Sequence, residues 1–590
     1  MSASTTPPPA SNGSTGDEQQ EVKQMEKIAI HDQVPGHDNY YEKNGLRTYG
    51  DGEDHDHEPP MSSKRFMSLA AMAFLWTGSQ LPMYLYGGVP PYIYGDIGGV
   101  DRWIWMTLAN LIASAAVCPF VGSLSDLLGR RYVALMGAGF IILGMIVCST
   151  AKVMNVFIGG MTLSGIGAGM AELTALAGTS ELAPTAKRGK YNAGLILTIL
   201  PWCPSVLWSQ LIATHGGWRW CGLLGGLWMF LGFLVILFFY FPPPRINSTG
   251  LTRKQLIAQI DFVGGFLSVS GMILFLAGLQ WGGYQYKWTS AHVLAPLLLG
   301  AALLVAFGLW ESYGAKYPMF PARIKQAPQI LTLTLVITFI SGANFISLLM
   351  FWPTQSFNVY GHDPVQVGLR GLPVAFCVMV GAVINLSCLS IFKGRNKELL
   401  IISCVLMTAG VGALSCADHF SMYRLWGILV LAGLGTGGII IPAAVITTII
   451  CPDDLIATVT ALTLAVRVIG GAIGYCVYYN VFVNKFVPNA VKMIGGVMEL
   501  ELHITNVTYI ETAIGYTSAS LLTLLKTIPG IAGNDTAYEM VVLAGQEAFA
   551  ASYRSIYYVS LAFGGVAILS ACFLGDIGQY MDDHVAVVMH

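Results

Sequence analysis

Charged residues are scarce in this sequence. Only 11% of the 590 residues are Asp, Glu, Lys or Arg, whereas an average soluble protein has roughly 25%. Hydrophobic residues make up 54% of the chain, and the formal net charge is −2. This composition excludes an ordinary soluble enzyme and favours a protein whose main body lies in lipid.

Several kinds of functional motif are also missing. No long run of Lys or Arg occurs, so the electrostatic footprint of a nucleic-acid-binding protein is absent from the sequence. The 11 cysteines are scattered singly and form no CxxC pair, so neither a zinc site nor a disulfide framework is predicted. A phosphate-binding loop and a Ser/His/Asp order are lacking as well. We therefore expect neither an enzyme nor an ATP-driven pump, and no cofactor.

The first 63 residues differ from the rest of the chain. They hold 12 acidic and 4 basic residues and no apolar run, which predicts a disordered acidic tail over residues 1–63. His55-Asp56-His57 in this tail could bind a metal ion, but we interpret it as part of a solvated acidic segment and predict no metal site. No cleavable signal peptide is recognised.

Beyond the tail, apolar runs long enough to cross a membrane recur along the chain. A transmembrane helix needs about 20 mainly apolar residues, and fourteen such runs are present. The predicted spans are residues 66–86, 103–124, 132–151, 156–177, 191–212, 220–241, 262–281, 291–310, 330–352, 372–392, 399–417, 425–450, 457–481 and 557–574. The sequence therefore predicts an all-α membrane protein with fourteen transmembrane helices.

Basic residues flank the predicted spans mainly on one side. With the N-terminus inside, the six cytoplasmic flanks hold 16 Lys and Arg residues, and the six loops on the other face hold 6. Because Lys and Arg are retained on the cytoplasmic side, we expect both termini in the cytoplasm and residues 484–552 outside. This outer segment carries two Asn-X-Thr sequons, and Asn506 and Asn534 are predicted glycosylation sites.

A pattern of glycine and proline repeats at an offset of 268 residues. It consists of Gly165-Ile166-Gly167-Ala168-Gly169 with Pro184, and of Gly433-Leu434-Gly435-Thr436-Gly437 with Pro452. We predict two related six-helix bundles, at 64–245 and 327–590, with two inserted helices at 246–326 between them. Parallel repeats with a ligand between them are typical of transporters. The glycines are interpreted as stripes for close helix packing and not as a dinucleotide motif.

One polar segment joins the second and third predicted spans. It reads Gly122-Ser123-Leu124-Ser125-Asp126-Leu127-Leu128-Gly129-Arg130-Arg131. Its glycines permit a tight turn, and its charged residues can bond to neighbouring helix ends in one alternating-access state and release them in the other. The segment resembles the signature loop of the major facilitator superfamily. We therefore predict a gating loop that consists of Gly122, Asp126, Gly129, Arg130 and Arg131; the alternative is that both arginines only fix topology.

Further motifs extend this resemblance over most of the membrane region. They are Glu181-Leu182-Ala183-Pro184 with Arg188-Gly189, Trp218-Arg219-Trp220, Leu279-Gln280-Trp281-Gly282-Gly283, and Arg467-Val468-Ile469-Gly470-Gly471-Ala472-Ile473-Gly474. Together with fourteen spans, they resemble the drug:proton antiporters with fourteen spans, and among these the fungal trichothecene-efflux-pump-like branch. The resemblance implies proton-coupled export of amphipathic toxins, secondary metabolites or drugs across the plasma membrane. The expected partners are a small-molecule substrate, protons and the lipid bilayer, and we expect a monomer.

Two other functions remain open at this point. Siderophore transporters have a similar layout, so a siderophore-iron or other nutrient importer coupled to protons is the alternative. A membrane sensor that does not transport is a third, more distant alternative, because a gating loop would serve no purpose in such a protein.

Two positions depart from the antiporter pattern. Many proton antiporters of the superfamily carry an Arg in the fourth span where this chain has Met161, so coupling through that position is excluded. In the fifth span, Pro201-Trp202-Cys203-Pro204 stands where antiporters usually have a glycine-rich stretch around a proline. Pro204 is expected to kink the helix, because a proline in a helix interior removes a backbone hydrogen bond.

Two charged residues lie inside predicted spans. Glu172 belongs to the fourth span and Arg467 to the thirteenth. An ionisable side chain in hydrocarbon costs several kcal/mol, so each is a candidate for proton coupling. Glu172 either binds and releases a proton, forms a fixed ion pair or reaches the membrane interface. Arg467 either influences a nearby carboxylate, holds an anionic substrate or has only a structural partner.

Aromatic and amide side chains in the spans are candidates for the substrate pathway. They are Trp76, Gln80, Asn110, Asn344, Trp352 and Gln355. Aromatic walls with few amides suit an amphipathic ligand. Helix packing and positioning at the membrane interface are the alternative explanation.

Overall fold

The computed structural model describes residues 58–243, 253–283, 285–418 and 422–587. The chain divides into two units, Met1–Arg47 and Thr48–His590, and all described residues belong to the second. Most of the predicted acidic tail, including His55-Asp56-His57, lies outside the described residues.

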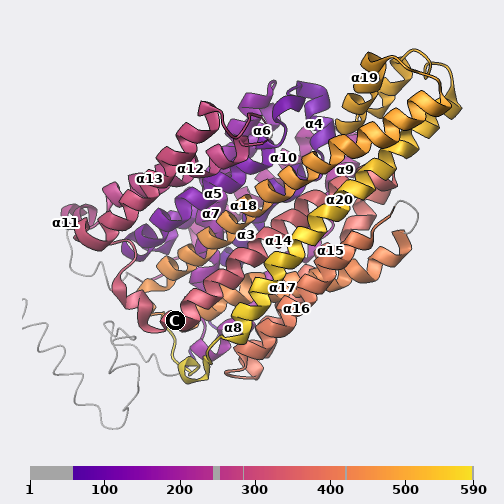
Figure 1. Ribbon diagram of the computed structural model, residues 1–590. Helices are drawn as coiled ribbons and strands as arrows, with labels where there is room; N and C mark the ends of the chain where they lie inside the picture. Colours follow the sequence, from indigo (N-terminus) through magenta and orange to yellow (C-terminus); the bar gives the residue numbers. More distant parts are fainter. Residues whose placement is uncertain (1–57, 244–252, 284, 419–421, 588–590) are drawn as a thin grey trace, which may run out of the picture. The chain divides into compact units, whose positions relative to one another are not determined.

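Nearly all described residues of the second unit are helical, and they form no β-strand, only two isolated bridges. From the N-terminal side, the helices are α3 (Ser63–Tyr86), α4 (Pro90–Ile97), α5 (Trp105–Leu128), α6 (Arg130–Thr150), α7 (Met154–Glu181), α8 (Arg188–Leu197), α9 (Ser205–His215), α10 (Arg219–Phe239) and α11 (Arg253–Ala258). They continue with α12 (Phe262–Trp281), α13 (Ala291–Leu309), α14 (Pro328–Tyr360), α15 (Pro364–Ile391), α16 (Asn396–Ala413), α17 (Met422–Ile449), α18 (Ile456–Ala490), α19 (Val507–Ser518) and α20 (Asp535–Cys572). The long helices run side by side (Figure 1), which confirms the predicted all-α fold class.

The number of membrane spans remains a prediction. Among the described residues, 12 helices are long and apolar enough to cross a membrane. Helices occupy all fourteen predicted positions, but α3 falls outside this set, and the fifth position is divided between the short helices α8 and α9.

Two prolines divide the fifth predicted span. α8 ends at Leu197, a short 3-10 turn covers Leu200–Trp202, and α9 begins at Ser205. A proline has no N–H to donate, and its ring clashes with the preceding turn. The kink predicted at Pro204 is therefore a complete interruption of the helix.

The repeated glycines allow their helices to approach closely. A Cβ atom on Gly165 of α7 would lie 2.4 Å from the carbonyl oxygen of Asn110 on α5. In the second bundle, a Cβ atom on Gly437 of α17 would lie 1.9 Å from the carbonyl oxygen of Val378 on α15. No side chain fits at either distance, so the interpretation of these glycines as packing stripes is confirmed.

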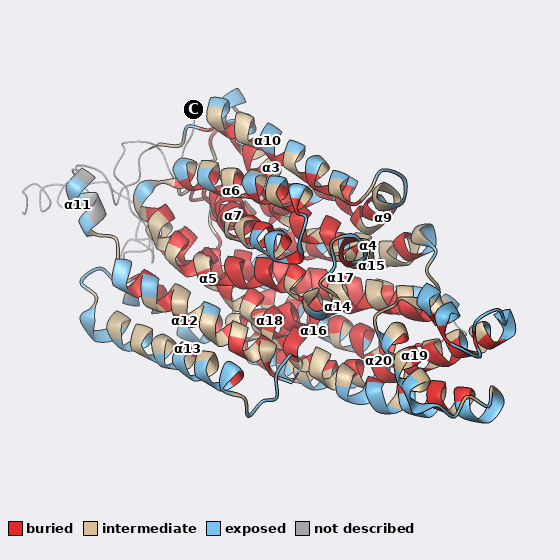
Figure 2. Ribbon diagram, turned by 90° about the horizontal axis from the view of Figure 1, so that it is seen from above, coloured by how far each residue is buried: buried red, intermediate tan, exposed pale blue. Residues whose placement is uncertain are grey.

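The inserted pair α12 and α13 lies outside the buried core. α12 packs on α5 and α18, while α13 contacts mainly α12. Figure 2 shows α13 with mostly intermediate and exposed residues, whereas α7 and α17 are largely buried. Exposed Leu298 and Val305 give α13 an apolar outer face, as a helix in contact with lipid requires.

The last two long helices extend well beyond their predicted spans. α18 reaches Ala490, whereas the predicted span ended at residue 481, and α20 begins at Asp535, not near residue 557. Between them, residues 491–534 form two π-helical turns, α19 and a 3-10 helix, and we call this connection the cap. The segment predicted to lie outside is therefore largely helical, and α19 lies near one end of the helices in Figure 1.

Candidate functional site

A cavity of about 1080 Å³, which includes space open to solvent, lies among helices of both predicted bundles. Its walls come mainly from α3, the interruption between α8 and α9, α14, α15, α17 and α18, and most of the lining residues are apolar or aromatic. Five of the residues predicted from the sequence line it: Trp76, Gln80, Glu172, Trp352 and Arg467. We call it the central cavity.

Glu172 and Arg467 form a buried ion pair at the central cavity. Arg467 Nη2 of α18 donates to Glu172 Oε1 of α7, and the two side chains are only 10% and 9% exposed. Gly342 lets α14 approach α18 closely at this point, because a Cβ atom there would lie 2.0 Å from the Arg467 carbonyl oxygen. A bond between α7 and α18 joins the two bundles, and loss of one charge would leave the other buried without compensation.

Two indole groups at the central cavity have no hydrogen-bond partner. The Nε1 atoms of Trp76 and Trp202 are unpaired, and these residues are 5% and 7% exposed. Trp352 differs, because its Nε1 donates to the carbonyl oxygen of Arg370 at 2.9 Å. A buried donor without a partner is costly.

Trp202 and its neighbour Cys203 were not among the predicted pathway residues, although both line the central cavity. The two prolines around them were the available signal, because an interrupted helix exposes its side chains differently from a continuous one. Interrupted helices at the middle of a transporter often mark the ligand site.

Three predicted amides lie outside the central cavity. Asn110 donates to Ser164 Oγ at 3.0 Å, and Asn344 Oδ1 accepts from the Tyr478 hydroxyl at 2.8 Å. Gln355 accepts a hydrogen bond from the Tyr557 hydroxyl. These amides connect neighbouring helices within one bundle.

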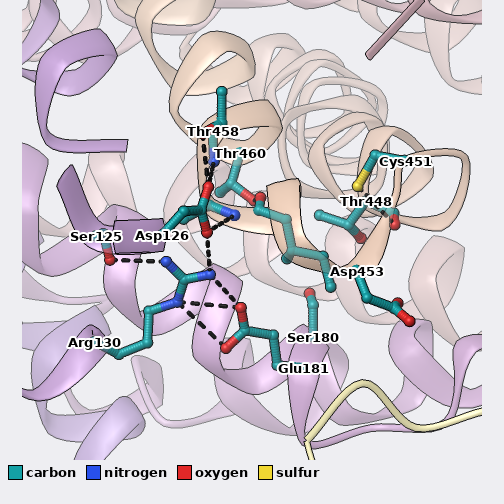
Figure 3. A network of polar contacts seen from close by, with 12 residues as sticks. Ser125, Asp126, Arg130, Ser180, Glu181, Thr448, Cys451, Asp453, Thr458 and Thr460 are labelled. Atoms are coloured by element: carbon teal, nitrogen blue, oxygen red, sulfur yellow. Dashed lines mark hydrogen bonds and ion pairs between the residues drawn. The ribbon is translucent and has the colours of Figure 1, made fainter. Parts of the chain in front are cut away.

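A second polar centre lies where α5 and α20 end and where α6 and α18 begin; we call this the Arg130 end. Arg130 is fully buried, and its Nη1 donates to Ser125 Oγ at 2.9 Å and its Nη2 to Asp126 Oδ1 at 2.6 Å. Its Nε donates to Glu181 Oε1 at 3.1 Å, and Figure 3 shows the guanidinium between the two carboxylates. Glu181 was quoted as part of a family motif but was not predicted as a gating residue.

Asp126 connects this centre to the second bundle. It accepts hydrogen bonds from the Thr458 backbone N–H at 2.8 Å and from the Thr458 hydroxyl at 2.6 Å, at the beginning of α18 (Figure 3). Gly122 permits the approach, because a Cβ atom there would lie 2.4 Å from the Ala461 Cβ. Gly129 has a φ of 94°, which allows the sharp turn into α6.

Arg131, the last residue of the predicted loop, has a different environment. It donates to the carbonyl oxygen of Leu237 at 2.9 Å, and its guanidinium lies 3.8 Å from the centre of the Phe241 ring. Both partners belong to the end of α10 or follow it directly. Arg131 therefore holds α6 to α10, and both of these partners belong to the first bundle.

The chain near the C-terminus adds a further connection at the Arg130 end. The Thr185 N–H donates to the carbonyl oxygen of His584 at 2.9 Å, and His584 Nε2 lies 2.6 Å from Asp453 Oδ2. Arg188 Nη2 lies 3.6 Å from Asp453 Oδ1. Residues that follow α20 thus bind the junction between α7 and α8.

The two predicted glycosylation sites are exposed and begin helices. Asn506 Oδ1 accepts from the Thr508 N–H at 3.0 Å, and Asn534 Oδ1 accepts from the Ala537 N–H at 3.1 Å. A glycan would attach to the other side-chain atom, Nδ2, so helix capping and glycosylation are compatible. Within the described ranges, no group of three or more His, Cys, Asp or Glu residues could hold a metal ion.

Comparisons of the sequence give one family. The family model described as fungal trichothecene efflux pump (TRI12) matches residues 62–590. The trichothecene efflux pump TRI12 of Fusarium sporotrichioides is 24% identical over 515 residues, which are 84% of this chain and 83% of that protein. The MFS-type transporter TwmF of Talaromyces wortmannii is 26% identical over 493 residues, which are 83% of this chain and 86% of that one.

Solved structures that are similar to this one have the major facilitator fold. The human organic anion transporter MFSD10 has a TM-score of 0.51 and 13% sequence identity, over 86% of this chain and 100% of that one. The proton:xylose symporter XylE has a TM-score of 0.51 and 12% identity, over 89% of this chain and 98% of that one. The predicted major facilitator fold is confirmed, while the count of fourteen transmembrane helices stays a prediction.

Proposed function

Because the chain belongs to the fungal trichothecene efflux pump family, we propose that it exports an amphipathic secondary metabolite, toxin or drug in exchange for protons across the plasma membrane. The chain is a multi-pass efflux transporter of the major facilitator superfamily and not an enzyme. Trichothecenes, which give the Fusarium relative its name, are the first compounds to test.

The proposal of proton coupling rests on the ion pair between Glu172 and Arg467. Protonation of Glu172 would remove the negative charge that Arg467 pairs with and would weaken the bond between α7 and α18. A proton that arrives from outside would open this bond and let the bundles rearrange. Release of the proton to the cytoplasm would close it again.

Binding of substrate is assigned to the central cavity. The unpaired indole N–H groups of Trp76 and Trp202 supply donors, and the apolar walls accept rings and alkyl groups. A ligand with oxygen acceptors on an apolar skeleton matches both features.

The contacts at the Arg130 end correspond to a gate. Asp126 of the first bundle binds Thr458 of the second, so the halves are joined at this end. In the topology that we propose, with both termini cytoplasmic, this end faces the cytoplasm and the cap faces outside. The same topology places Asn506 and Asn534 where they can be glycosylated.

Export is favoured over siderophore uptake by the surroundings of Arg467. An anionic siderophore would need this guanidinium, but its charge is already paired with Glu172. The curated relatives named as efflux pumps favour export in the same way.

The proposal is tested in inside-out plasma-membrane vesicles, where the lumen corresponds to the outside of the cell. With an acidic lumen, we expect a tritiated trichothecene to accumulate above its external concentration, and a protonophore to abolish this accumulation. Impermeant thiol labelling of Asn506→Cys in intact cells checks the orientation of the cap.

Two results would reject the proposal. Uptake that is the same with and without the pH gradient would contradict proton exchange. Faster entry of labelled ferric siderophore into intact expressing cells, with no effect on the trichothecene, would make the importer the correct alternative.

A further inference from the structure

A second cavity lies beyond the central cavity, toward the cap. It measures about 910 Å³ with the space open to solvent included, and Pro353 of α14 lines both cavities, so the two adjoin. Along α18, Thr458 of the gate, Arg467 of the central cavity and Tyr479 of the second cavity follow one another. At 1.5 Å per residue, these positions are roughly 14 and 18 Å apart. The second cavity, here called the outer chamber, thus continues the same path.

The walls of the outer chamber are aromatic and uncharged. Trp103 comes from the first bundle, and Phe351, Phe357, Tyr479 and Phe482 come from the second. None of the described residues that line it is Asp, Glu, Lys or Arg. The central cavity, by contrast, contains Glu172 and Arg467. Aromatic faces without charge favour a neutral ligand with rings.

One buried polar atom in the outer chamber has no partner. Gln210 is 2% exposed, and its Nε2 donates to the Gly88 carbonyl oxygen at 2.7 Å, while its Oε1 is unpaired. The bond to Gly88 fixes the amide, and Oε1 has no partner among the described residues. A hydroxyl group on a ligand would satisfy it.

The cap covers the outer chamber and forms hydrogen bonds with a helix of each bundle. The Tyr94 hydroxyl of α4 donates to the Ala519 carbonyl oxygen at 3.1 Å, and the Ser520 hydroxyl donates to Asn358 Oδ1 of α14 at 2.6 Å. Ser520 has a φ of 59°, a conformation that a non-glycine residue rarely adopts. Residues 518–520 therefore form a roof that binds both bundles.

We propose that the outer chamber is a second binding site, for a neutral, ring-containing molecule that carries a hydroxyl group. The rings pack on Tyr479 and Phe482, and the hydroxyl donates to Gln210 Oε1. The proposal rests on the proposed function, in which the exported molecule passes from the central cavity through this chamber. The two sites are complementary, because the central one offers donors and the outer one offers an acceptor.

Equilibrium binding to the purified full chain in lipid nanodiscs tests this site, with a hydroxylated, tritiated trichothecene as the probe. We expect two equivalents bound at saturation in the unchanged protein and one in the double variant Tyr479→Ala/Phe482→Ala. Gln210→Met should weaken the second equivalent by about 3- to 10-fold, the effect of one lost hydrogen bond. Phe238→Ala on the exposed face of α10 is the matched control and should bind two equivalents.

The outcomes separate this proposal from the proposed function. One equivalent in the unchanged protein, with transport intact, would overturn the outer site alone. Two equivalents in both aromatic and control variants would also overturn it. A protein that neither binds nor transports the probe would reject the proposed function and the outer site together. Thermal unfolding of each variant confirms that lost binding is not lost folding.

Discussion

A charged side chain inside a membrane helix is stable only with a partner or with access to water. Glu172 and Arg467 satisfy this requirement with each other, although they are 295 positions apart in the sequence. Breaking such a buried pair by removing one partner costs about 3–5 kcal/mol, because the remaining charge is buried alone.

Glu172→Gln should keep the protein folded but uncouple transport from the pH gradient. Glutamine preserves the shape of the side chain and cannot titrate, so we expect loss of uphill accumulation in vesicles while downhill exchange of trichothecene continues. Glu499→Gln, an exposed change in the cap, is the matched control. Uphill transport with an unchanged pH profile in Glu172→Gln would assign the coupling to another carboxylate.

Arg467→Met should destabilise the protein, because it leaves the buried Glu172 carboxylate without its cation. We expect a loss of about 3–5 kcal/mol in the free energy of unfolding, seen as a lower melting temperature. The double variant Glu172→Gln/Arg467→Met removes both charges and should recover most of this loss. If the double variant is as unstable as the single one, the two residues are not coupled in the folded protein.

At the scale of residues, the sequence predicts which charged side chains lie inside the apolar helices, but it does not predict how they are paired. The rarity of charge in the apolar runs was enough to identify Glu172 and Arg467. Their pairing depends on how α7 packs against α18, which no local pattern encodes. Asn110, Asn344 and Gln355 resembled Gln80 in the sequence, but only Gln80 lines the central cavity.

At the scale of helices, the junction between α5 and α6 joins the two bundles. Asp126 accepts from the first turn of α18, and Arg130 holds Asp126 and Glu181 together. Bonds from a carboxylate to the N–H groups at a helix N-terminus are strengthened by the helix dipole. They can break and re-form without unfolding either helix, as a gate requires.

Asp126→Asn should slow transport by about tenfold while substrate binding stays intact. Weakening charge-assisted bonds costs roughly 1.5–3 kcal/mol, and the central cavity contains none of these groups. Binding and turnover are measured separately, in nanodiscs and in vesicles.

Arg131→Gln provides the control for this change, because the hydrogen bond that Arg131 donates to Leu237 lies within its own bundle. If Asp126→Asn lost binding and turnover equally, the loop would be required for folding and not for gating.

Helix positions followed from apolar runs, but helix ends and interruptions did not. Pro204 indicated a kink, and the structure shows two separate helices. α18 and α20 continue past their apolar runs because their additional turns pack on each other, for example with the ring centres of Phe486 and Phe549 4.4 Å apart. Hydropathy predicts only the helical segments that lipid would cover. It therefore did not predict these additional turns, which are covered by other parts of the protein.

At the scale of the whole second unit, three sites follow one another along α18. The gate at Thr458, the central cavity at Arg467 and the outer chamber at Tyr479 lie on one helix that contacts α5, α7, α14 and α20. A movement of α18 against α7 would therefore act on all three at once. The repeated glycine pattern predicted two related bundles, whereas the roof over the outer chamber could be recognised only from contacts between distant segments.

Proton movement driven by substrate is the most direct test of exchange. The purified chain is reconstituted in liposomes that enclose a pH-sensitive dye, with equal pH on both sides and a gradient of trichothecene across the membrane. The account predicts that protons move against the direction of the substrate, and that Glu172→Gln abolishes this proton movement while the substrate still equilibrates. Substrate movement without any proton flux in the unchanged protein would contradict the account.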